Sequence, residues 1–559
     1  MTKFARAMRV SAFALCAAVS AVSPALAGAA DFRPEAFARH IQVLASDEFE
    51  GRAPASPGEA KTIDYIVRQF KAAGLKPGGD IVRPGMRAWT QRVPLRHFTF
   101  GGPVQVSVTA NGAREAWTQG EQLSLSPTQT GIDHLVIVNA PVVFVGYGVT
   151  APERNWNDFK GYDLKGKVAL VLVNDPDFET GVGDFGGKAM TYYGRWTYKF
   201  EEAARQGAIG FLVVHETHAA GYGWNTVKNS VEDVFDVVRA NPKERHALLE
   251  GWIQRDAAAG LMQKAGLDFE ALKKVAQTRE FKPVELQGVT FSADVAIKVQ
   301  DAASHNVVGI VPGTRHPRET ILYTAHWDHL GIGRPDAKGD RIYNGAVDNA
   351  SGVSMLIELA RAFVKAPRPD RSVVFIATTG EEKGFLGTEY YVANPLYPLE
   401  TTAADLNMDG MNVYGRTRNI SAAGESPLTL VDDMIRVGAK HGMAYSPEAH
   451  PEYGSYFRND HFPFAKVGVP ALTFGGGTDL EKGGKAAGEA AYEAYKRDKY
   501  HQPADEYDPN WDLSGMAQEA EVFFDLGREL ANSRVWPQWK AGAEFKAARD
   551  ATQSQRTGR

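Results

Sequence analysis

Between about residues 288 and 530, short apolar runs alternate with amphipathic helical patterns, and this alternation constrains the fold more than any other feature of the chain. The runs ILYTA and VVFIA have the length and composition of buried strands. Between them, ASGVSMLIELARAFVKA has the spacing of an amphipathic helix. Strands joined through helices form parallel pairs, because the connection must cross a face of the sheet. The sequence therefore predicts an α/β fold with a mixed, largely parallel sheet flanked by helices.

Histidine and acidic residues recur in loops of this region, and most of them directly follow a predicted strand. In chain order they are His326, Asp328, Asp348, Glu381, Glu382, Asp409 and His501. One His beside an Asp, or one adjacent Glu pair, is ordinarily part of a solvated surface loop. Five such clusters in one domain indicate a shared site, because the carboxyl ends of parallel strands meet at one edge of the sheet.

The residue types in these clusters indicate a metal centre. Imidazole and carboxylate ligands without thiolates suit zinc, with manganese or cobalt as substitutes. Two cations about 3.5–4 Å apart need a shared carboxylate, because their charges repel each other. The set offers one acid to bridge, two histidines, two further carboxylates and an acid that can serve as a base. Since a single ion needs only three protein ligands, the inventory favours two ions.

The motifs HWDHLG, GAVDNASG, TTGEEKGFLGTEYY, NMDGMN and YHQPADEYD resemble, in this order, the motif series of the di-zinc exopeptidases. That family includes secreted bacterial leucyl aminopeptidases and plasma glutamate carboxypeptidase. The resemblance extends to LASDEFEGR near the N-terminus. The segment with VVFVGYGV, YDLKGKVALVLVND and AARQGAIGFLVVHE resembles the protease-associated domain that is often inserted in these enzymes. The expected domains are an N-terminal part of the catalytic domain over 28–138, the protease-associated insert over 139–281 and the catalytic domain over 282–535.

The resemblance also implies a role for each residue of the site. Two metals would share one acid and have two ligands each of their own: Asp348 bridges, His326 and Asp409 complete one site, and Glu382 and His501 complete the other. Glu381 would be the general base, and Asp328 would orient the imidazole of His326. By contrast, His329 is expected to make local hydrogen bonds rather than to bind metal.

Three further residues are implied around the substrate. Tyr500 occupies the place of a tyrosine that stabilises the oxyanion in some members of the family. The segment RNDHFPF is similar to the family's R-S-D-H pattern, with Asn459 in place of the serine, and there Arg458 and His461 would line the substrate pocket. The implied reaction is hydrolysis of peptides from the amino end. No nucleic-acid partner is expected, because Lys+Arg 62 against Asp+Glu 67 leaves no basic excess.

Alternative functions remain open at this point. A carboxypeptidase or dipeptidase on the same two-zinc centre would use arginine, such as Arg458, to hold a terminal carboxylate. A non-catalytic binding protein on this scaffold, as in the transferrin receptor, would have lost several ligand positions, and none is lost here. Glutaminyl cyclase resembles the fold but works with a single zinc, so the full double set of ligands argues against it.

The N-terminus has the pattern of a cleaved secretory signal over residues 1–27. Three basic residues precede an apolar stretch at 10–22, which an Ala-Leu-Ala site follows before Gly28. The stretch is shorter than the roughly 20 residues of a membrane span. It contains the single cysteine, Cys16, which excludes a disulfide scaffold, and Leu15 is too bulky for the residue before a lipidated cysteine. We expect a periplasmic or extracellular protein with no membrane anchor after cleavage.

Three segments outside the motifs carry weaker patterns. The spacing of apolar residues predicts helices from 32 to about 95. Residues 241–276 are charged and helical in pattern, which indicates a surface excursion. The tail at 536–559 is polar and is expected to be frayed.

Overall fold

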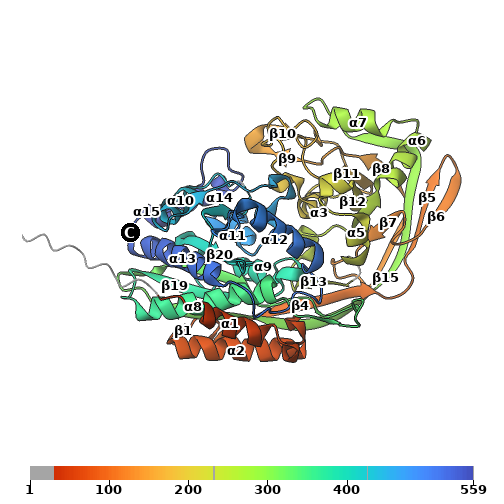
Figure 1. Ribbon diagram of the computed structural model, residues 1–559. Helices are drawn as coiled ribbons and strands as arrows, with labels where there is room; N and C mark the ends of the chain where they lie inside the picture. The colour runs from red at the N-terminus through yellow and green to blue at the C-terminus, as the bar shows by residue number, and fades with distance from the viewer. Residues whose placement is uncertain (1–30, 231–232, 425, 558–559) are drawn as a thin grey trace, which may run out of the picture.

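The computed structural model describes residues 31–230, 233–424 and 426–557. The predicted signal segment therefore lies outside the described residues. Figure 1 shows a larger and a smaller lobe, with one long strand, β15 (Val284–Val311), running through both. The first part of β15 pairs with strands of the smaller lobe, among them β5 (Gln105–Ala110), and the later part pairs with strands of the larger lobe, among them β4 (Thr90–Phe100) and β19 (Arg371–Thr378). The lobes thus share a continuous strand rather than a linker.

The sheet of the larger lobe has the order β13-β4-β15-β19-β16-β20-β23-β21-β22. Its remaining strands are β13 (Asp233–Val237), β16 (His316–His326), β20 (Thr402–Asn407), β21 (Asn419–Ala422), β22 (Ala444–Tyr445) and β23 (Ala471–Gly476). The four central strands β19, β16, β20 and β23 are parallel, and β4 and β15 are antiparallel. The prediction of a mixed, largely parallel sheet in an α/β fold is confirmed.

Helices flank this sheet. They are α1 (Pro34–Leu44), α2 (Pro57–Ala73), α8 (Gly352–Lys365), α9 (Leu386–Ala393), α10 (Thr429–Lys440), α11 (His461–Lys466), α12 (Gly484–Asp498) and α13 (Ser514–Asn532). Helix α8 buries its apolar face as its sequence predicts, and the ring of Phe363 lies 5.8 Å from that of Phe375 on β19. The ring of Phe375 in turn stacks on that of Tyr323 on β16 at 5.3 Å. This packing fixes α8, and the loop before it, against the centre of the sheet.

The smaller lobe has a second sheet, in the order β6-β5-β15-β8-β11-β12-β14-β7. Its other elements are β6 (Ala113–Trp117), β7 (Leu123–Leu125), β8 (His134–Phe144), β11 (Val168–Leu172), β12 (Gly210–His215), β14 (Leu249–Gln254), α3 (Trp196–Arg205), α4 (Thr217–Ala220), α5 (Trp224–Ser230), α6 (Arg255–Lys264) and α7 (Phe269–Ala276). The predicted helix, glycine turn and buried strand are present as α3, Gly207 and β12, which runs parallel to β11.

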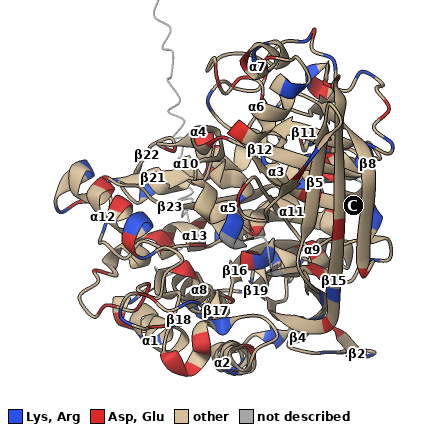
Figure 2. Ribbon diagram, turned by 90° about the vertical axis from the view of Figure 1, so that its right-hand side faces the viewer, with Lys and Arg blue, Asp and Glu red and all other residues tan. Residues whose placement is uncertain are grey.

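Several short strands and two C-terminal helices complete the fold. They are β1 (Lys76–Pro77), β2 (Ile81–Arg83), β3 (Met86–Arg87), β9 (Thr150–Ala151), β10 (Trp156–Asn157), β17 (Gly331–Ile332), β18 (Ile342–Tyr343), α14 (Lys546–Asp550) and α15 (Gln553–Thr557). None of the helices in the described part of the chain has both the length and the apolar character needed to cross a membrane. In Figure 2, basic and acidic segments are interspersed over both lobes, in keeping with the near balance of charge in the sequence.

Three sequence-based expectations are wrong in detail. The helical pattern expected up to about residue 95 ends at Ala73, the last residue of α2. Residues 90–100 form the strand β4 instead, because this stretch pairs along β15. The sheet of the smaller lobe already includes β5, β6 and β7, so the predicted boundary at residue 139 lies too late in the chain. Residues 249–254 were expected to belong to a charged helical surface segment, but they form the buried strand β14, which pairs with β12 inside the sheet.

The C-terminal tail also differs from its prediction, because the described part packs on the larger lobe. The side chain of Trp539 is buried and donates through Nε1 to the carbonyl of Gly468. The guanidinium of Arg549, likewise buried, donates to the carbonyl of Thr402 at the start of β20. These contacts anchor the segment that the polar composition suggested would fray.

Candidate metal centre

The histidine and acidic residues predicted to share a site do converge at the carboxyl ends of the parallel strands. His326 is the last residue of β16 and pairs in register with Thr378, the last residue of β19. Glu381 follows β19 by three residues, and Asp409 follows β20 by two. Because β19, β16 and β20 are adjacent and parallel, their following loops meet at one edge.

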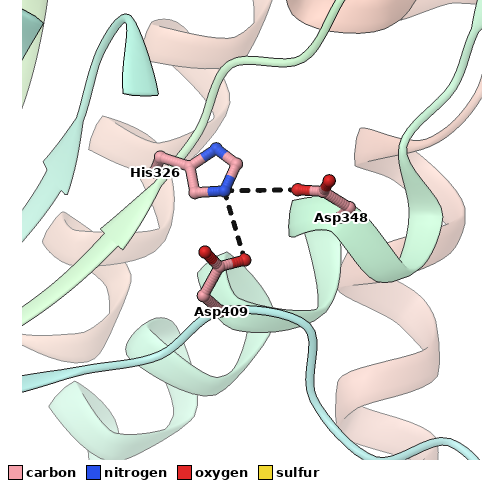
Figure 3. Close-up of side chains that lie close together, drawn as sticks. All are labelled: His326, Asp348 and Asp409. Carbon is pink, nitrogen blue, oxygen red and sulfur yellow. Dashed lines mark hydrogen bonds and ion pairs between the residues drawn. The ribbon is translucent and has the colours of Figure 1, made fainter. Parts of the chain in front are cut away.

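The first group of candidate ligands is His326, Asp348 and Asp409 (Figure 3). The imidazole Nε2 of His326 lies 3.3 Å from Oδ1 of Asp348 and 3.3 Å from Oδ1 of Asp409. The side chain of His326 is only 1% exposed. Asp348 comes from the helical turn Ala346–Ser351 that leads into α8. Three ligand-type atoms thus face one point from three different elements.

A second group shares Asp348 with the first. It consists of His329, Asp348 and Glu382, whose ligand-type atoms lie within 4.8 Å of one another. His501 joins it, because its Nε2 is 3.3 Å from Oδ2 of Asp348 and 3.3 Å from Oε2 of Glu382. Asp348 therefore points one oxygen toward His326 and the other toward His501, as a ligand shared by two ions would.

The spacing of these atoms fits zinc. Ligand atoms about 2.0–2.2 Å from a tetrahedral zinc ion are themselves about 3.3–3.6 Å apart. Four separations, from Nε2 of His326 and Nε2 of His501 to their carboxylate partners, are each 3.3 Å. Nitrogen and oxygen donors without thiolate also match this ion. The residues present can hold a metal at each end of the Asp348 carboxylate.

His329 is a residue that sequence reasoning set aside. It is fully buried, and its Nδ1 lies 2.6 Å from Oε1 of Glu382. The HWDH motif places it three residues after His326, but spacing alone does not show that the chain turns back toward Glu382. The structure therefore offers three ligand candidates around the second site besides Asp348, and His329 either binds there or holds Glu382 in place.

Buried Arg52 holds the two ligand loops together. Its guanidinium is 1% exposed and donates to the carbonyls of Leu44, Trp327, Asn344 and Gly345. Trp327 follows His326, and Gly345 lies three residues before Asp348. Burial lowers the pKa of Arg52 to about 10, which leaves it charged at neutral pH. Arg52, the last residue of the motif LASDEFEGR, thus has a structural role, although that role could not be assigned from the sequence.

Asp505, in the motif YHQPADEYD, supports Asp348 from the other side. Its carboxylate accepts the backbone N–H groups of Val347 and Asp348, both at 3.1 Å. Asn349 ties the same loop to the next ligand: its amide donates to the carbonyl of Met408, adjacent to Asp409. Such outer contacts fix the orientation of metal ligands. Neither residue was singled out from the sequence.

Glu381 and Asp328 lie beside the first group. The N–H of Glu381 donates to Oδ1 of Asp328 at 3.2 Å, and burial raises the pKa of Glu381 well above its usual range. Asp328 does not orient His326 through its carboxylate, since Oδ1 is 3.9 Å from Nδ1 of His326. The backbone carbonyl of Asp328 lies 3.0 Å from that nitrogen instead. Burial also raises the pKa of Asp328 to about 7.

The three predicted substrate residues differ in their burial and in their contacts. Tyr500 stacks on the ring of His501 at 3.8 Å and is partly exposed, so it borders the second group. Arg458 is half-buried at the end of a short helical turn before α11. His461 is fully buried, and its Nδ1 lies 2.8 Å from the hydroxyl of Thr473. His461 therefore belongs to the core and does not line an open pocket, which corrects its prediction.

The fold and the ligand cluster define a class of protein: an α/β protein with a histidine–carboxylate metal centre at the carboxyl edge of its sheet. Residues 306–524 match the model of peptidase family M28, so this part of the chain resembles that family. The matched range contains every candidate ligand. It begins within β15, after the other strands of the smaller lobe, so the resemblance of that lobe to a protease-associated domain stays a prediction.

The chain is also similar to parts of several curated proteins. It is 27% identical over 216 residues to aminopeptidase NAALADL1 of Mus musculus, a match that covers 34% of this chain and 25% of the relative. It is 26% identical over 200 residues to aminopeptidase YwaD of Bacillus subtilis, a match that covers 34% of this chain and 40% of the relative. It is 36% identical over 103 residues to a probable zinc metalloprotease of Pyrenophora teres f. teres (strain 0-1), and this match covers 18% of this chain and 22% of the relative. The chain thus spans less than half the length of these relatives.

Among solved structures, an aminopeptidase from Aneurinibacillus sp. strain AM-1 is similar over 89% of this chain and 94% of its own. The TM-score is 0.48 and the sequence identity is 19%. A zinc aminopeptidase from Bacillus subtilis is similar over 90% of this chain and 96% of its own, with a TM-score of 0.42 and 18% identity.

Proposed function

We propose that the protein is a zinc-dependent aminopeptidase with two metal ions per chain. The observation that carries the proposal is the placement of Asp348, whose two carboxylate oxygens face different histidines at 3.3 Å. The family of residues 306–524 and the names of the curated relatives, two aminopeptidases and a zinc metalloprotease, support the same function.

In this proposal His326, Asp348 and Asp409 hold one zinc ion, and Asp348, Glu382 and His501 hold the other. Manganese or cobalt are substitutes with the same ligand preferences. When bound, such a pair of ions acidifies a water molecule and polarises the scissile carbonyl. Arg52, Asp505 and Asn349 keep the ligand loops at their separation through the hydrogen bonds described above.

Glu381 is the proposed general base. It adjoins the ligand Glu382 yet makes no ion pair among the described residues, and burial raises the pKa of its carboxyl. A raised pKa brings the group toward the range in which it can accept a proton from water and return it to the leaving amine. Glu381 and Asp409 also offer negative charge to a protonated amino terminus of the substrate. Tyr500, stacked on His501, is the proposed hydroxyl donor to the oxyanion.

The location of the protein in or outside the cell is part of the proposal. The first 27 residues have the pattern of a secretory signal, which supports a periplasmic or extracellular peptidase acting on peptide substrates. The smaller lobe is proposed to be a protease-associated domain because of its sequence motifs.

Two parallel assays test the proposed function. Zinc-loaded protein should hydrolyse leucine anilide, lose the activity on treatment with a chelator and regain it on addition of zinc. Acetylation of the substrate amine removes a charge-assisted hydrogen bond and should lower kcat/KM by roughly 10–100-fold. Equal hydrolysis of the acetylated anilide would contradict an aminopeptidase, and activity that survives full metal removal would contradict the metal centre.

A further inference from the structure

A cavity of about 560 Å³ lies between helix α2 and the strands β4 and β15. This volume is within the roughly 300–1,000 Å³ that is usual for small-molecule sites. Most of its wall comes from one face of α2 and the turn before it, and Thr90, Ala303 and His305 close it from the strands. Ala60 and Asp64 at its rim are exposed, so the cavity opens to solvent. We call this space the α2 cavity.

The wall that α2 contributes is acidic at one end and aliphatic along the rest. Glu59, Ile63 and Val67 are four residues apart, so they lie on one face of the helix. The second acid of the wall, Asp64, forms an exposed ion pair with Arg68. In the described ranges, no lysine or arginine lines the cavity. An aliphatic wall beside one acid fits a ligand with a positive charge at the end of an apolar chain.

The carboxylate of Glu59 is buried without a cationic side chain beside it. It is 4% exposed, its Oε1 lies 3.1 Å from Nδ1 of His305, and its other oxygen accepts the N–H of Ala55. Among the described residues, no lysine or arginine is within ion-pair distance of it. By contrast, Glu358 on α8, which also faces a histidine, pairs with Arg361 at 2.6 Å. A buried carboxylate without a cation costs free energy, which a bound cation would offset.

The α2 cavity adjoins the candidate metal centre but is built from other residues. The carbonyl of His305 accepts a hydrogen bond from Nε1 of Trp327 at 2.9 Å, and Trp327 directly follows His326. Arg52, which anchors the ligand loops, lies three residues before Ala55 of the cavity wall, and both have left-handed backbone angles, φ 55° and 57°. Such angles are uncommon outside glycine, so the surrounding structure must hold this turn in place. An occupant of the cavity would thus lie beside the ligand loops and outside the reacting centre.

We propose that the α2 cavity is a binding site for a primary alkylammonium group, either that of a short free amine or that of a lysine side chain. The ammonium has three N–H donors and no acceptor, and it would donate to the carboxylate of Glu59. From Glu59 to Ile63 the helix rises about 6 Å, which is about the length of an extended chain of four or five carbons. The carbon chain would therefore lie along Ile63. The site is independent of the proposed hydrolysis, because binding needs no turnover.

Calorimetry on the zinc-loaded full chain tests the site. Acetohydroxamate is present throughout, because it chelates zinc, carries no cation and so keeps amines from the metals. The probes pentylamine, 1-pentanol and pentanoate share a carbon chain and differ in charge. Pentylamine should bind roughly 10–100-fold more tightly than the other two, since only its ammonium forms a charge-assisted hydrogen bond with Glu59. Binding of Nα-acetyl-lysine amide would extend the site to lysine side chains, and its failure to bind would limit the site to free amines.

Three variants locate the binding. Glu59→Gln should weaken pentylamine binding roughly 10–100-fold because it removes the charge. Ala303→Leu, on the opposite wall, should weaken it by filling the cavity, and this variant decides alone if Glu59→Gln does not fold. Glu358→Gln is the matched control, since it removes another acid that faces a histidine, and it should keep the wild-type affinity. Equal affinity of the wild type for all three probes, no binding of pentylamine, or wild-type affinity in both cavity variants would overturn the proposal.

Discussion

At the scale of single residues, Glu381 and Glu382 are neighbours with different environments. Glu382 lies 3.3 Å from His501, whereas the carboxyl of Glu381 has a pKa that burial raises. We predict that Glu381→Gln lowers kcat by roughly 10²–10⁴-fold, because it removes proton transfer but no metal ligand. Metal content and melting temperature should stay at wild-type values. Glu35→Gln, an exposed position on α1, is the control, and wild-type kcat in the Glu381 variant would refute the base assignment.

The ligands were accessible to sequence reasoning because their positions follow from the strands. A His or acid directly after a buried parallel strand must lie at the carboxyl edge of the sheet, as His326 and Asp409 do. Arg52 could not be assigned a role, since it acts on the carbonyls of residues almost 300 positions away. His461 was misplaced because a motif shows residue type but not burial.

At the scale of elements, Arg52 joins the loops that follow β16 and precede α8. We predict that Arg52→Met destabilises the protein by about 3–5 kcal/mol, since it leaves buried carbonyl groups unpaired. It should also weaken metal binding, measured by competition with a chelator, because the ligand loops lose their common anchor. Arg68→Met, at an exposed ion pair on α2, is the control and should change neither quantity measurably. Unchanged metal affinity in the Arg52 variant would refute the anchor role.

Helix α13 contributes a pH-dependent term to stability through Glu519. Its buried carboxylate accepts the N–H groups of Gly476 and Asn412, and burial raises its pKa to about 7. The pKa of this carboxyl is lower in the unfolded chain, so between about pH 4.5 and 7 the folded state binds more protons than the unfolded state. The free energy of unfolding therefore falls as the pH rises through this range. We predict that Glu519→Gln reduces this fall by about 3 kcal/mol between pH 4.5 and 8 in urea denaturation. An identical pH dependence in wild type and variant would contradict the assignment.

The elements themselves were predicted best where pattern and pairing agree. The run VVFIA and the helix ASGVSMLIELARAFVKA have the predicted structure in β19 and α8. Residues 90–100 were mispredicted because their pairing partner on β15 lies about 200 positions away. The tail was mispredicted because its anchors, Trp539 and Arg549, are isolated in a polar segment and show no periodicity.

At the scale of the whole molecule, ion pairs fasten the smaller lobe to the larger one. Although burial opposes it, Lys466 and Arg245 lower the pKa of Glu201, so this carboxylate is charged at neutral pH. We predict that Glu201→Gln costs about 3–5 kcal/mol, because it leaves buried cations with one acid fewer. Thermal denaturation measures the loss. Glu115→Gln, which breaks an exposed pair with Lys264, should cost at most about 1 kcal/mol, and an equal cost in both variants would refute the fastening role.

We propose that one carboxylate, that of Asp348, joins two metal ions at the edge of the sheet. Metal content per chain, measured by mass spectrometry after dialysis, tests it most directly. The wild type should hold two zinc ions, Asp348→Ala should hold fewer than one, and His326→Ala or His501→Ala should each lose mainly one. Two tightly bound ions in the Asp348→Ala protein, or a single ion in the wild type at saturating zinc, would contradict the account.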